Sequence, residues 1–228
     1  MKQFVLAVAL AALVASPAMA QESGVREASG YVSAFAGPAW AAGNSTGSIV
    51  FEGGARIAPH VMLFGSLGRF SNLQGDLQPT LQSTTATLAG DGIGVAGGGT
   101  LPAWYGIGGV RAEIPTNLRV TPYVLGGFGM ARLNPQPQFT FASGTLPDGT
   151  TPTVGLNVTS NLLATGTITT PPPSNALMAV FGGGIEVPLV PHWVGDVGYR
   201  YSYIAADQSL SASALNTNVL TFGIGYRF

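Results

Sequence analysis

The stretch Val219-Leu220-Thr221-Phe222-Gly223-Ile224-Gly225-Tyr226-Arg227-Phe228 decides the fold. Bulky apolar side chains alternate along it with small or polar ones, so a strand built from it has one apolar face. Its length is about what a tilted strand needs to cross a bilayer. A strand can lie in lipid only when its backbone groups are paired on both sides, as in a closed barrel. The stretch therefore predicts a transmembrane β-barrel.

The N-terminal residues indicate export. Met1 and Lys2 give a short positive start, residues 4–15 are apolar, and Ala18-Met19-Ala20 forms an A-x-A cleavage site. We expect residues 1–20 to be a cleavable signal peptide, residues 21–29 a periplasmic lead-in and residues 30–228 the barrel. The chain has no cysteine, so we expect neither disulfides nor a lipid-modified N-terminal cysteine.

The composition agrees with a membrane barrel. Only 8% of the residues are charged, against about 25% in soluble domains, and glycine occurs 33 times. After the N-terminal segment no apolar run approaches the ~20 residues of a transmembrane helix. The only lysine is Lys2, and the arginines do not outnumber the acidic residues, so the sequence predicts no nucleic-acid partner.

Eight strand candidates are joined by connections of unequal length. Short turns alternate with long loops, which is typical of outer-membrane barrels with periplasmic turns and extracellular loops. The expected fold is all-β, an eight-stranded antiparallel transmembrane barrel in the bacterial outer membrane, surrounded by outer-membrane lipid. The expected strands are Gly30–Ala41, Gly47–Ala58, Val61–Ser71, Pro102–Ile114, Arg119–Leu133, Ala176–Pro188, Trp193–Ala205 and Asn216–Phe228. The expected long loops are residues 72–101 and 134–175.

Charged residues in five of these strands lie opposite the apolar face. An arginine on the lipid face near the bilayer centre would cost about 2–4 kcal/mol. We therefore expect these side chains to point into the lumen and to pair there, because an unpaired buried charge is costly. We interpret the network as structural, with a gated polar path for ions as the alternative. The predicted network comprises Glu52, Arg56, Arg111, Glu113, Glu186, Asp196 and Arg200, and Arg227 is also predicted to point inward.

Three strands, at residues 30–41, 61–71 and 119–133, do not show a clear alternation. In the second of them Ser66 and Arg69 disagree in phase, which suggests a bulge. Aromatic residues near strand ends predict two interfacial girdles. The long-loop girdle would contain Trp40, Phe70, Trp104 and Tyr203, and the short-turn girdle Trp193, Tyr226 and Phe228.

The long loops are the expected interaction surface. A loop as long as residues 134–175 is either functional or disordered. Residues that favour an extended backbone, at 138–145 and 154–170, predict a hairpin within that loop. All charges in the large loops are aspartates, so the loops should bind anionic lipid heads poorly. They form either a bland coat or a binding surface for an unknown ligand, through residues 72–101 and 134–175.

The sequence predicts no catalytic, metal or cofactor site. Residues 92–97 match a dinucleotide-binding pattern, but no helix or βαβ unit is expected after them. The only histidines, His60 and His192, each follow a proline in an expected turn, and two ligands are too few for a metal site.

The chain resembles the small eight-stranded outer-membrane β-barrels related to the transmembrane part of outer membrane protein A. The resemblance covers residues 30–228 and is carried by the cleavage site, the strand starting Thr121-Pro122-Tyr123-Val124, the glycine-rich strands and the ending Gly225-Tyr226-Arg227-Phe228. It implies an assembly signal at Tyr226 and Phe228, recognised by the barrel-assembly machinery, with periplasmic chaperones assisting biogenesis. It also implies an interior ion-pair network like the one predicted above.

We expect a non-enzymatic protein with a role in envelope structure or surface interaction and an interior plugged by side chains. One alternative is a narrow channel for ions or small solutes. The other is a lipid-modifying enzyme, which would need an outer-leaflet histidine beside a serine.

Overall fold

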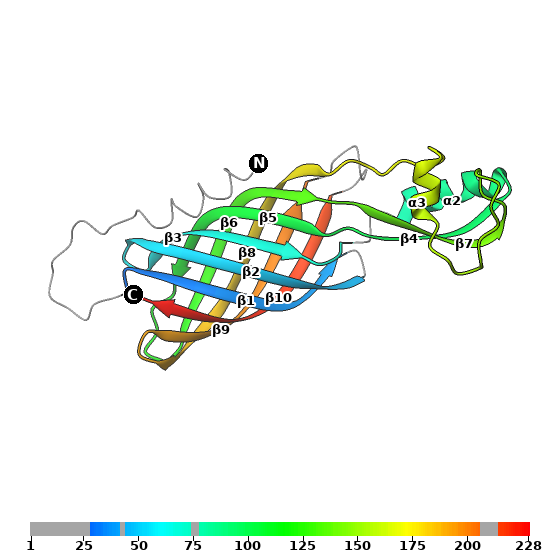
Figure 1. Ribbon diagram of the computed structural model, residues 1–228. Coiled ribbons are helices and arrows are strands. Elements are labelled where there is room, and N and C mark those ends of the chain that lie inside the picture. The colour runs from blue at the N-terminus through cyan, green and yellow to red at the C-terminus, as the bar shows by residue number, and fades with distance from the viewer. Residues whose placement is uncertain (1–27, 42–43, 74–77, 206–213) are drawn as a thin grey trace.

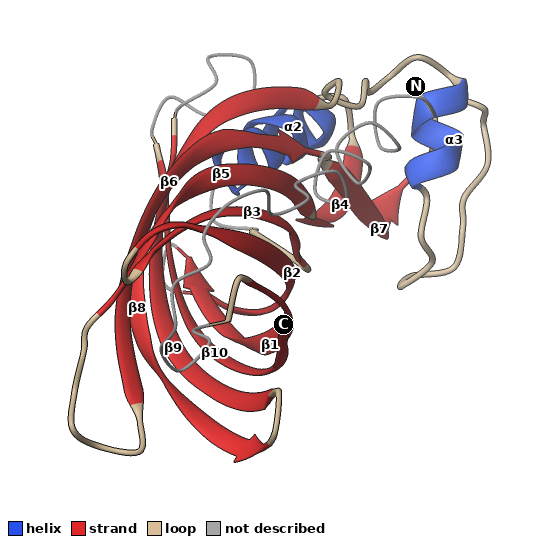
Figure 2. Ribbon diagram, turned by 90° about the vertical axis from the view of Figure 1, so that its left-hand side faces the viewer, coloured by secondary structure: helices blue, strands red, loops and turns tan. Residues whose placement is uncertain are grey.

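Eight antiparallel strands close a barrel, as Figures 1 and 2 show. The computed structural model describes residues 28–41, 44–73, 78–205 and 214–228. The predicted fold is confirmed, and each barrel strand begins and ends within three residues of its predicted bounds. The expected signal peptide and most of the lead-in lie outside the described residues. The barrel strands are β1 (Gly30–Ala41), β2 (Asn44–Ala58), β3 (Val61–Phe70), β5 (Ala103–Glu113), β6 (Thr121–Leu133), β8 (Ser174–Val190), β9 (Trp193–Ile204) and β10 (Leu215–Arg227).

The barrel closes where β1 pairs with β10, and its strands are staggered. Cα partners can be followed around the barrel from Trp40 through all eight strands, and the path returns to β1 at Gly30. The stagger is therefore ten residues. An even stagger keeps the two-residue side-chain period in phase, so every strand has one lumenal and one outer face.

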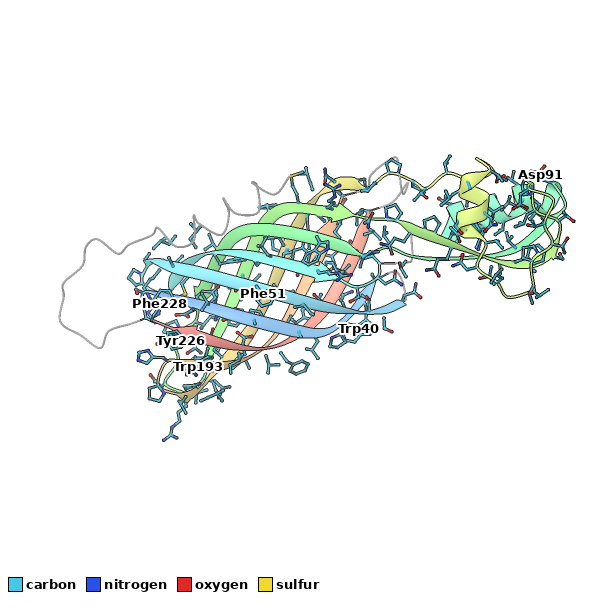
Figure 3. All side chains as sticks on the ribbon, in the orientation of Figure 1. Trp40, Phe51, Asp91, Trp193, Tyr226 and Phe228 are labelled. Carbon is cyan, nitrogen blue, oxygen red and sulfur yellow. The ribbon has the colours of Figure 1, made fainter. Side chains whose placement is uncertain are left out.

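The outer face is apolar, and the lumenal face carries charges. Phe51, Phe128 and Leu177 are among the most exposed side chains, at 62%, 71% and 69%, and Phe51 is labelled in Figure 3. In β2, β5, β8, β9 and β10, the residues predicted to face the lumen do so, and the predicted outer face is exposed. An outward-facing apolar band of this kind suits the hydrocarbon core of a bilayer, where apolar side chains are not exposed to water.

The three strands that the sequence left unphased alternate regularly. In β1, Tyr31 and Phe35 face the lumen, and in β6, Tyr123 does so. The bulge expected in β3 is wrong: Ser66 faces inward, and Arg69 faces outward without a break in register. The irregularities lie instead beside the turns, at residues 56–58 of β2 and 188–190 of β8.

Large lumenal rings pack against glycines of neighbouring strands. A Cβ placed on Gly68 would lie 2.3 Å from Tyr105 Cζ, and one on Gly223 would lie 2.3 Å from Phe35 Cδ1. These glycines give the rings room inside a narrow lumen, which explains why glycine occurs in strands that it normally weakens.

Two Pro-His turns close hairpins at one end of the barrel. His60 and His192 both have positive φ, at 61° and 71°. Their carbonyl oxygens accept hydrogen bonds from the N–H groups of Glu113 and Arg227, each at 2.7 Å. The turns thereby fix the ends of the strands that supply these two charges. We call this end, which also holds residues 114–120, the short-turn end, and the opposite end the long-loop end.

The two long loops fold together into a head beyond the long-loop end, shown at the right of Figure 1. Strand β4 (Ile93–Thr100) pairs with β7 (Gln136–Gly144), and helices α2 (Gln78–Gly90) and α3 (Thr159–Ala164) accompany them. The hairpin expected within residues 134–175 is present only as a short contact, in which Phe139 and Phe141 of β7 form backbone hydrogen bonds with residues 155–158. The main partner of β7 is β4 of the other loop, and α3 lies within residues 154–170. No helix of the described residues is long and apolar enough to cross a membrane.

The head continues the β5–β6 ladder. Only two residues separate β4 from β5, and only two separate β6 from β7. Asn134 N–H donates to Pro102 O at 3.0 Å between the two pairings, so one two-stranded ribbon runs from the short turn into the head. The head has its own buried apolar side chains, from α2, β4, β7 and the segment around α3: Leu81, Leu88, Ile93, Phe139, Phe141, Leu146, Val158 and Leu162.

Candidate functional site

Eight charged side chains from five barrel strands meet in the lumen. They include all seven residues of the predicted network. The eighth is Arg227, which the alternation of β10 had placed inward but which was not assigned to the network. Arginines and carboxylates are equal in number: Arg56, Arg111, Arg200 and Arg227 against Glu52, Glu113, Glu186 and Asp196.

Arg111 lies at the centre of this group and is fully buried. Its Nη2 lies 2.5 Å from Glu186 Oε1. Its Nη1 lies 3.9 Å from Glu52 Oε1 and 4.0 Å from Asp196 Oδ2. One guanidinium therefore faces three carboxylates supplied by three different strands.

Two tyrosines complete the surroundings of Arg111. The guanidinium carbon lies 4.9 Å from the ring centroid of Tyr31 and 3.6 Å from that of Tyr123. The Tyr31 hydroxyl donates to Glu52 at 2.7 Å, and the Tyr123 hydroxyl donates to Asp196 at 2.8 Å. Each tyrosine thus covers the cation with its ring and holds one of its carboxylates. Sequence reasoning missed both, because the phases of β1 and β6 were ambiguous.

The ion pairs extend from Arg111 in both directions. On one side, Arg200 Nη1 lies 2.9 Å from Glu52 Oε2, and the Arg200 guanidinium lies over the ring of Phe35 at 4.7 Å. On the other side, Arg227 bridges Glu186 and Glu113, and its distance to Glu113 Oε1 is 2.5 Å.

Arg56 completes the chain toward the short-turn end. Its Nη2 lies 3.5 Å from Glu113 Oε2, and its Nε donates to Ala28 O at 2.9 Å. Charges therefore alternate in sign without interruption along the lumen. We call this set the lumenal ion chain: Arg200, Glu52, Arg111, Glu186, Arg227, Glu113 and Arg56, with Asp196 beside Arg111.

The lumen beyond the ion chain, toward the long-loop end, is mostly apolar, with a few buried hydroxyl groups from Ser48, Ser202 and Thr217. Phe70 is fully buried there, and its ring centroid lies 5.0 Å from that of Tyr105. The prediction that Phe70 belongs to the outer girdle is wrong, because β3 turns it inward two strand positions after Gly68. The lumen thus contains an ionic layer and an apolar layer. Buried apolar side chains of the second layer include Ala39, Leu133, Met178, Ile204 and Val219.

The remaining girdle residues face outward at the two ends of the barrel. Trp40, Trp104 and Tyr203 are exposed near the long-loop end. Trp193, Tyr226 and Phe228 lie together at the opposite end, as Figure 3 shows for all three. The Tyr226 ring lies edge-on to Trp193 at 5.4 Å and stacks on His192 at 5.6 Å.

The last residue is held by the first strand. Phe228 and Gly30 exchange two backbone hydrogen bonds, both at 3.0 Å. The residues predicted as an assembly signal therefore lie on the outer face at the seam of the barrel, and their role in assembly stays a prediction.

The described residues contain no cluster of histidine, cysteine, aspartate or glutamate that could hold a metal ion. Residues 93–97 of the apparent dinucleotide-binding pattern lie in β4, and helix α2 precedes them in the chain, whereas the pattern requires a helix after them.

The sequence profile of the outer membrane protein beta-barrel domain matches residues 6–228. The chain belongs to this family. The similarity implied by the cleavage site, the glycine-rich strands and the C-terminal ending is thereby confirmed, and with it a place in the bacterial outer membrane.

A solved outer-membrane barrel shares the fold, and two other solved outer-membrane proteins show weaker similarity. Neisserial surface protein A is 16% identical, with a TM-score of 0.55 over 88% of this chain and 97% of that protein. The attachment invasion locus protein of Yersinia pestis is 13% identical, with a TM-score of 0.46 over 89% and 99%. The outer membrane enzyme PagL is 12% identical, with a TM-score of 0.40 over 85% and 97%. No curated protein sequence matches the chain.

Proposed function

We propose that this outer-membrane barrel is a non-enzymatic, non-conducting scaffold that presents its folded head for surface interaction. The observation that carries the proposal is the two-layered lumen. An eight-stranded barrel has room for side chains or one small ligand. Here the ion chain and the apolar layer lie one behind the other along the barrel.

A permeating ion would have to pass both layers. In the ionic layer it would compete with arginines and carboxylates that already neutralise one another. In the apolar layer, around Phe70 and Tyr105, it would exchange its hydration for a few serine, threonine and tyrosine hydroxyls, which is costly. The arrangement therefore supports the predicted plugged interior over the narrow channel.

The head supports a role in recognition of uncharged surfaces. Asp91 and Asp148 are its only charged residues in the described part of the chain. Asp148 accepts hydrogen bonds from the Thr150 hydroxyl and N–H, which lower the pKa of its carboxyl group. A cleft of about 360 Å³ lies between α2, β7 and the segment at residues 167–172, lined largely by threonine and proline. Hydroxyl and apolar surfaces of this kind suit a neutral glycan or an uncharged protein surface.

The proposed biogenesis rests on the expected signal peptide and on the resemblance to small outer-membrane barrels. Residues 1–20 direct export, periplasmic chaperones carry the chain, and Tyr226 and Phe228 mark it for the barrel-assembly machinery. Assembly in the usual orientation of such barrels places the short turns in the periplasm and the head outside the cell.

Catalysis of lipid modification is the less favoured function. Such an enzyme needs a histidine at the outer leaflet, and the chain has only His60 and His192. Both lie in the Pro-His turns of the short-turn end. Mass spectrometry of lipid A after overexpression is expected to show no change in acylation, and a shifted acyl pattern would contradict the proposal.

Planar-bilayer recording tests the closed lumen. Purified refolded protein is expected to give no unitary conductance steps, with a general porin as the positive control. Steps that change in size in an Arg200→Ala variant would show that ions pass along the lumenal ion chain, and the non-conducting proposal would be wrong.

Cell adhesion tests the head. The two loops pair with each other, so a clean deletion must remove residues 78–100 and 136–172 together, each replaced by a short Gly-Ser linker. Bacteria expressing this variant are expected to adhere less to host cells or matrix than bacteria expressing the intact protein at equal surface abundance. Equal adhesion would contradict a binding role for the head.

A further inference from the structure

The outer face of the barrel carries two arginines at the long-loop end. Arg69 is near the end of β3 and Arg132 near the end of β6, and both side chains are exposed. Four other arginines of the described residues are in the lumen, and Arg119 lies at the short-turn end. In the part of the chain that the structure describes, neither Arg69 nor Arg132 forms an ion pair.

A tryptophan lies between the two arginines. Trp104 of β5 is the Cα partner of Arg69 on one side and of Arg132 on the other. The Arg69 guanidinium lies 5.3 Å from the Trp104 ring centroid, and Trp104 is 60% exposed. Strands lie about 4.8 Å apart, so the two arginines start about 10 Å from each other on the same face. Their long side chains can converge on one anionic group above the indole.

The next outward positions toward the membrane are apolar. Leu67, Met130 and Leu177 form this row, and Gly106 lies between Leu67 and Met130. These three side chains are 44%, 54% and 69% exposed. The change from arginine to leucine and methionine over one strand repeat marks the boundary between headgroup and hydrocarbon, which an exposed tryptophan also favours.

We propose that Arg69, Trp104 and Arg132 bind the phosphate of a phosphorylated glycolipid in the outer leaflet. The arginines hold the phosphate by charge-assisted hydrogen bonds, the indole packs against the sugar, and the acyl chains lie over Leu67, Met130 and Leu177. A lipid is favoured over free phosphate because the apolar row directly adjoins the cations. The outer leaflet is assigned from the proposed orientation of the barrel. The site needs neither a closed lumen nor a binding head, so failure of those proposals is distinguishable from failure here.

Native mass spectrometry of the full mature protein in detergent tests the site. The probe is lipid A carrying both phosphates, and it is compared with the dephosphorylated form. The double variant Arg69→Gln, Arg132→Gln is expected to bind about 30-fold more weakly, or about fivefold for each arginine. Arg119→Gln, an exposed arginine at the other end, is the matched control and should bind as the intact protein does. Equal affinity of the double variant would overturn the proposal.

Three further measurements identify what is recognised. A double lysine variant should retain most of the binding, because it keeps both charges. Heat-modifiable gel migration of the glutamine variant shows that its barrel is folded. Equal binding of dephosphorylated lipid A would overturn the phosphate contact. Equal binding of phosphatidylglycerol would overturn the assignment to a glycolipid. Competition by inorganic phosphate at the same concentration as lipid A would overturn it as well.

Discussion

The guanidinium of Arg111 lies 3.6 Å from the ring centroid of Tyr123, and the hydroxyl of that tyrosine donates to Asp196. Tyr123 therefore contacts both members of a buried ion pair, the cation through its ring and the anion through its oxygen. Tyr31 makes the same pair of contacts with Arg111 and Glu52 from β1, on the opposite wall of the barrel from β6. The position of Arg111 is thus fixed from several strands at once.

Loss of the central cation should destabilise the barrel strongly. In Arg111→Met, three buried carboxylates lose their shared partner, and breaking a buried pair in this way costs about 3–5 kcal/mol. Urea unfolding in lipid vesicles, followed by tryptophan fluorescence, measures the free energy of unfolding. Arg119→Met, at an exposed position, should change it by less than about 0.5 kcal/mol. Equal stability of the two variants would refute the central role of Arg111.

Removal of one hydroxyl should separate the two contacts of Tyr123. Tyr123→Phe keeps the ring above Arg111 but removes a hydrogen bond to a charged group, which contributes about 1.5–3 kcal/mol. Tyr201→Phe is the matched control, because its hydroxyl bonds Asn216 on the exposed outer face. The same unfolding assay should show a clear loss of stability for Tyr123→Phe alone. A similar loss in both variants would contradict the argument.

Two glycines of the same strand should respond differently to a methyl group. Gly68→Ala places a Cβ 2.3 Å from the Tyr105 ring, whereas the nearest atom to a Cβ on Gly65 is 3.9 Å away. Overpacking of this kind costs about 1–3 kcal/mol, so Gly68→Ala should lower the urea midpoint and Gly65→Ala should not. Equal urea midpoints for the two variants would show that the Tyr105 ring is not packed tightly against Gly68.

The head should be removable only as a whole. Deletion of residues 78–100 and 136–172 together leaves the barrel ladders intact, so the variant should keep the heat-modifiable gel migration of a folded barrel. Deletion of residues 136–172 alone removes β7 and exposes the apolar side of β4 and α2, including Leu81 and Leu88.

Protease added to intact cells should then cleave the single-deletion variant within residues 78–100 and spare the intact protein. Resistance of that variant would show that α2 and β4 are stable without β7.

The alternation of side chains predicted much of the barrel because burial of charge in lipid is so costly. Glu52 and Arg111 had to face inward, and their strands fixed the phases of their neighbours. The same reasoning failed at the ends of strands, where the cost falls to about 0–1 kcal/mol. Arg69 therefore faces outward at little cost, and β3 needs no bulge to place Ser66 inward and Arg69 outward.

The head could not be predicted because its pairing is not local. β4 and β7 lie on either side of the β5–β6 hairpin, and their glycine, threonine and proline content resembles that of a loop. What brings them together is the ladder of β5 and β6 continuing past the membrane. The main partner of β7 lies in the other long loop, so the residues of one loop alone do not indicate this pairing.

This ribbon has a mechanical consequence. A partner that pulls on the head loads β4 and β7 together, and the tension passes into β5 and β6 along their length. This load acts in shear on the ladders that join β5 to β3 and β6 to β8. All hydrogen bonds of a ladder then share the force, and they do not break one at a time. The attachment of the head should hence withstand shear on the cell better than a tether formed by a single strand.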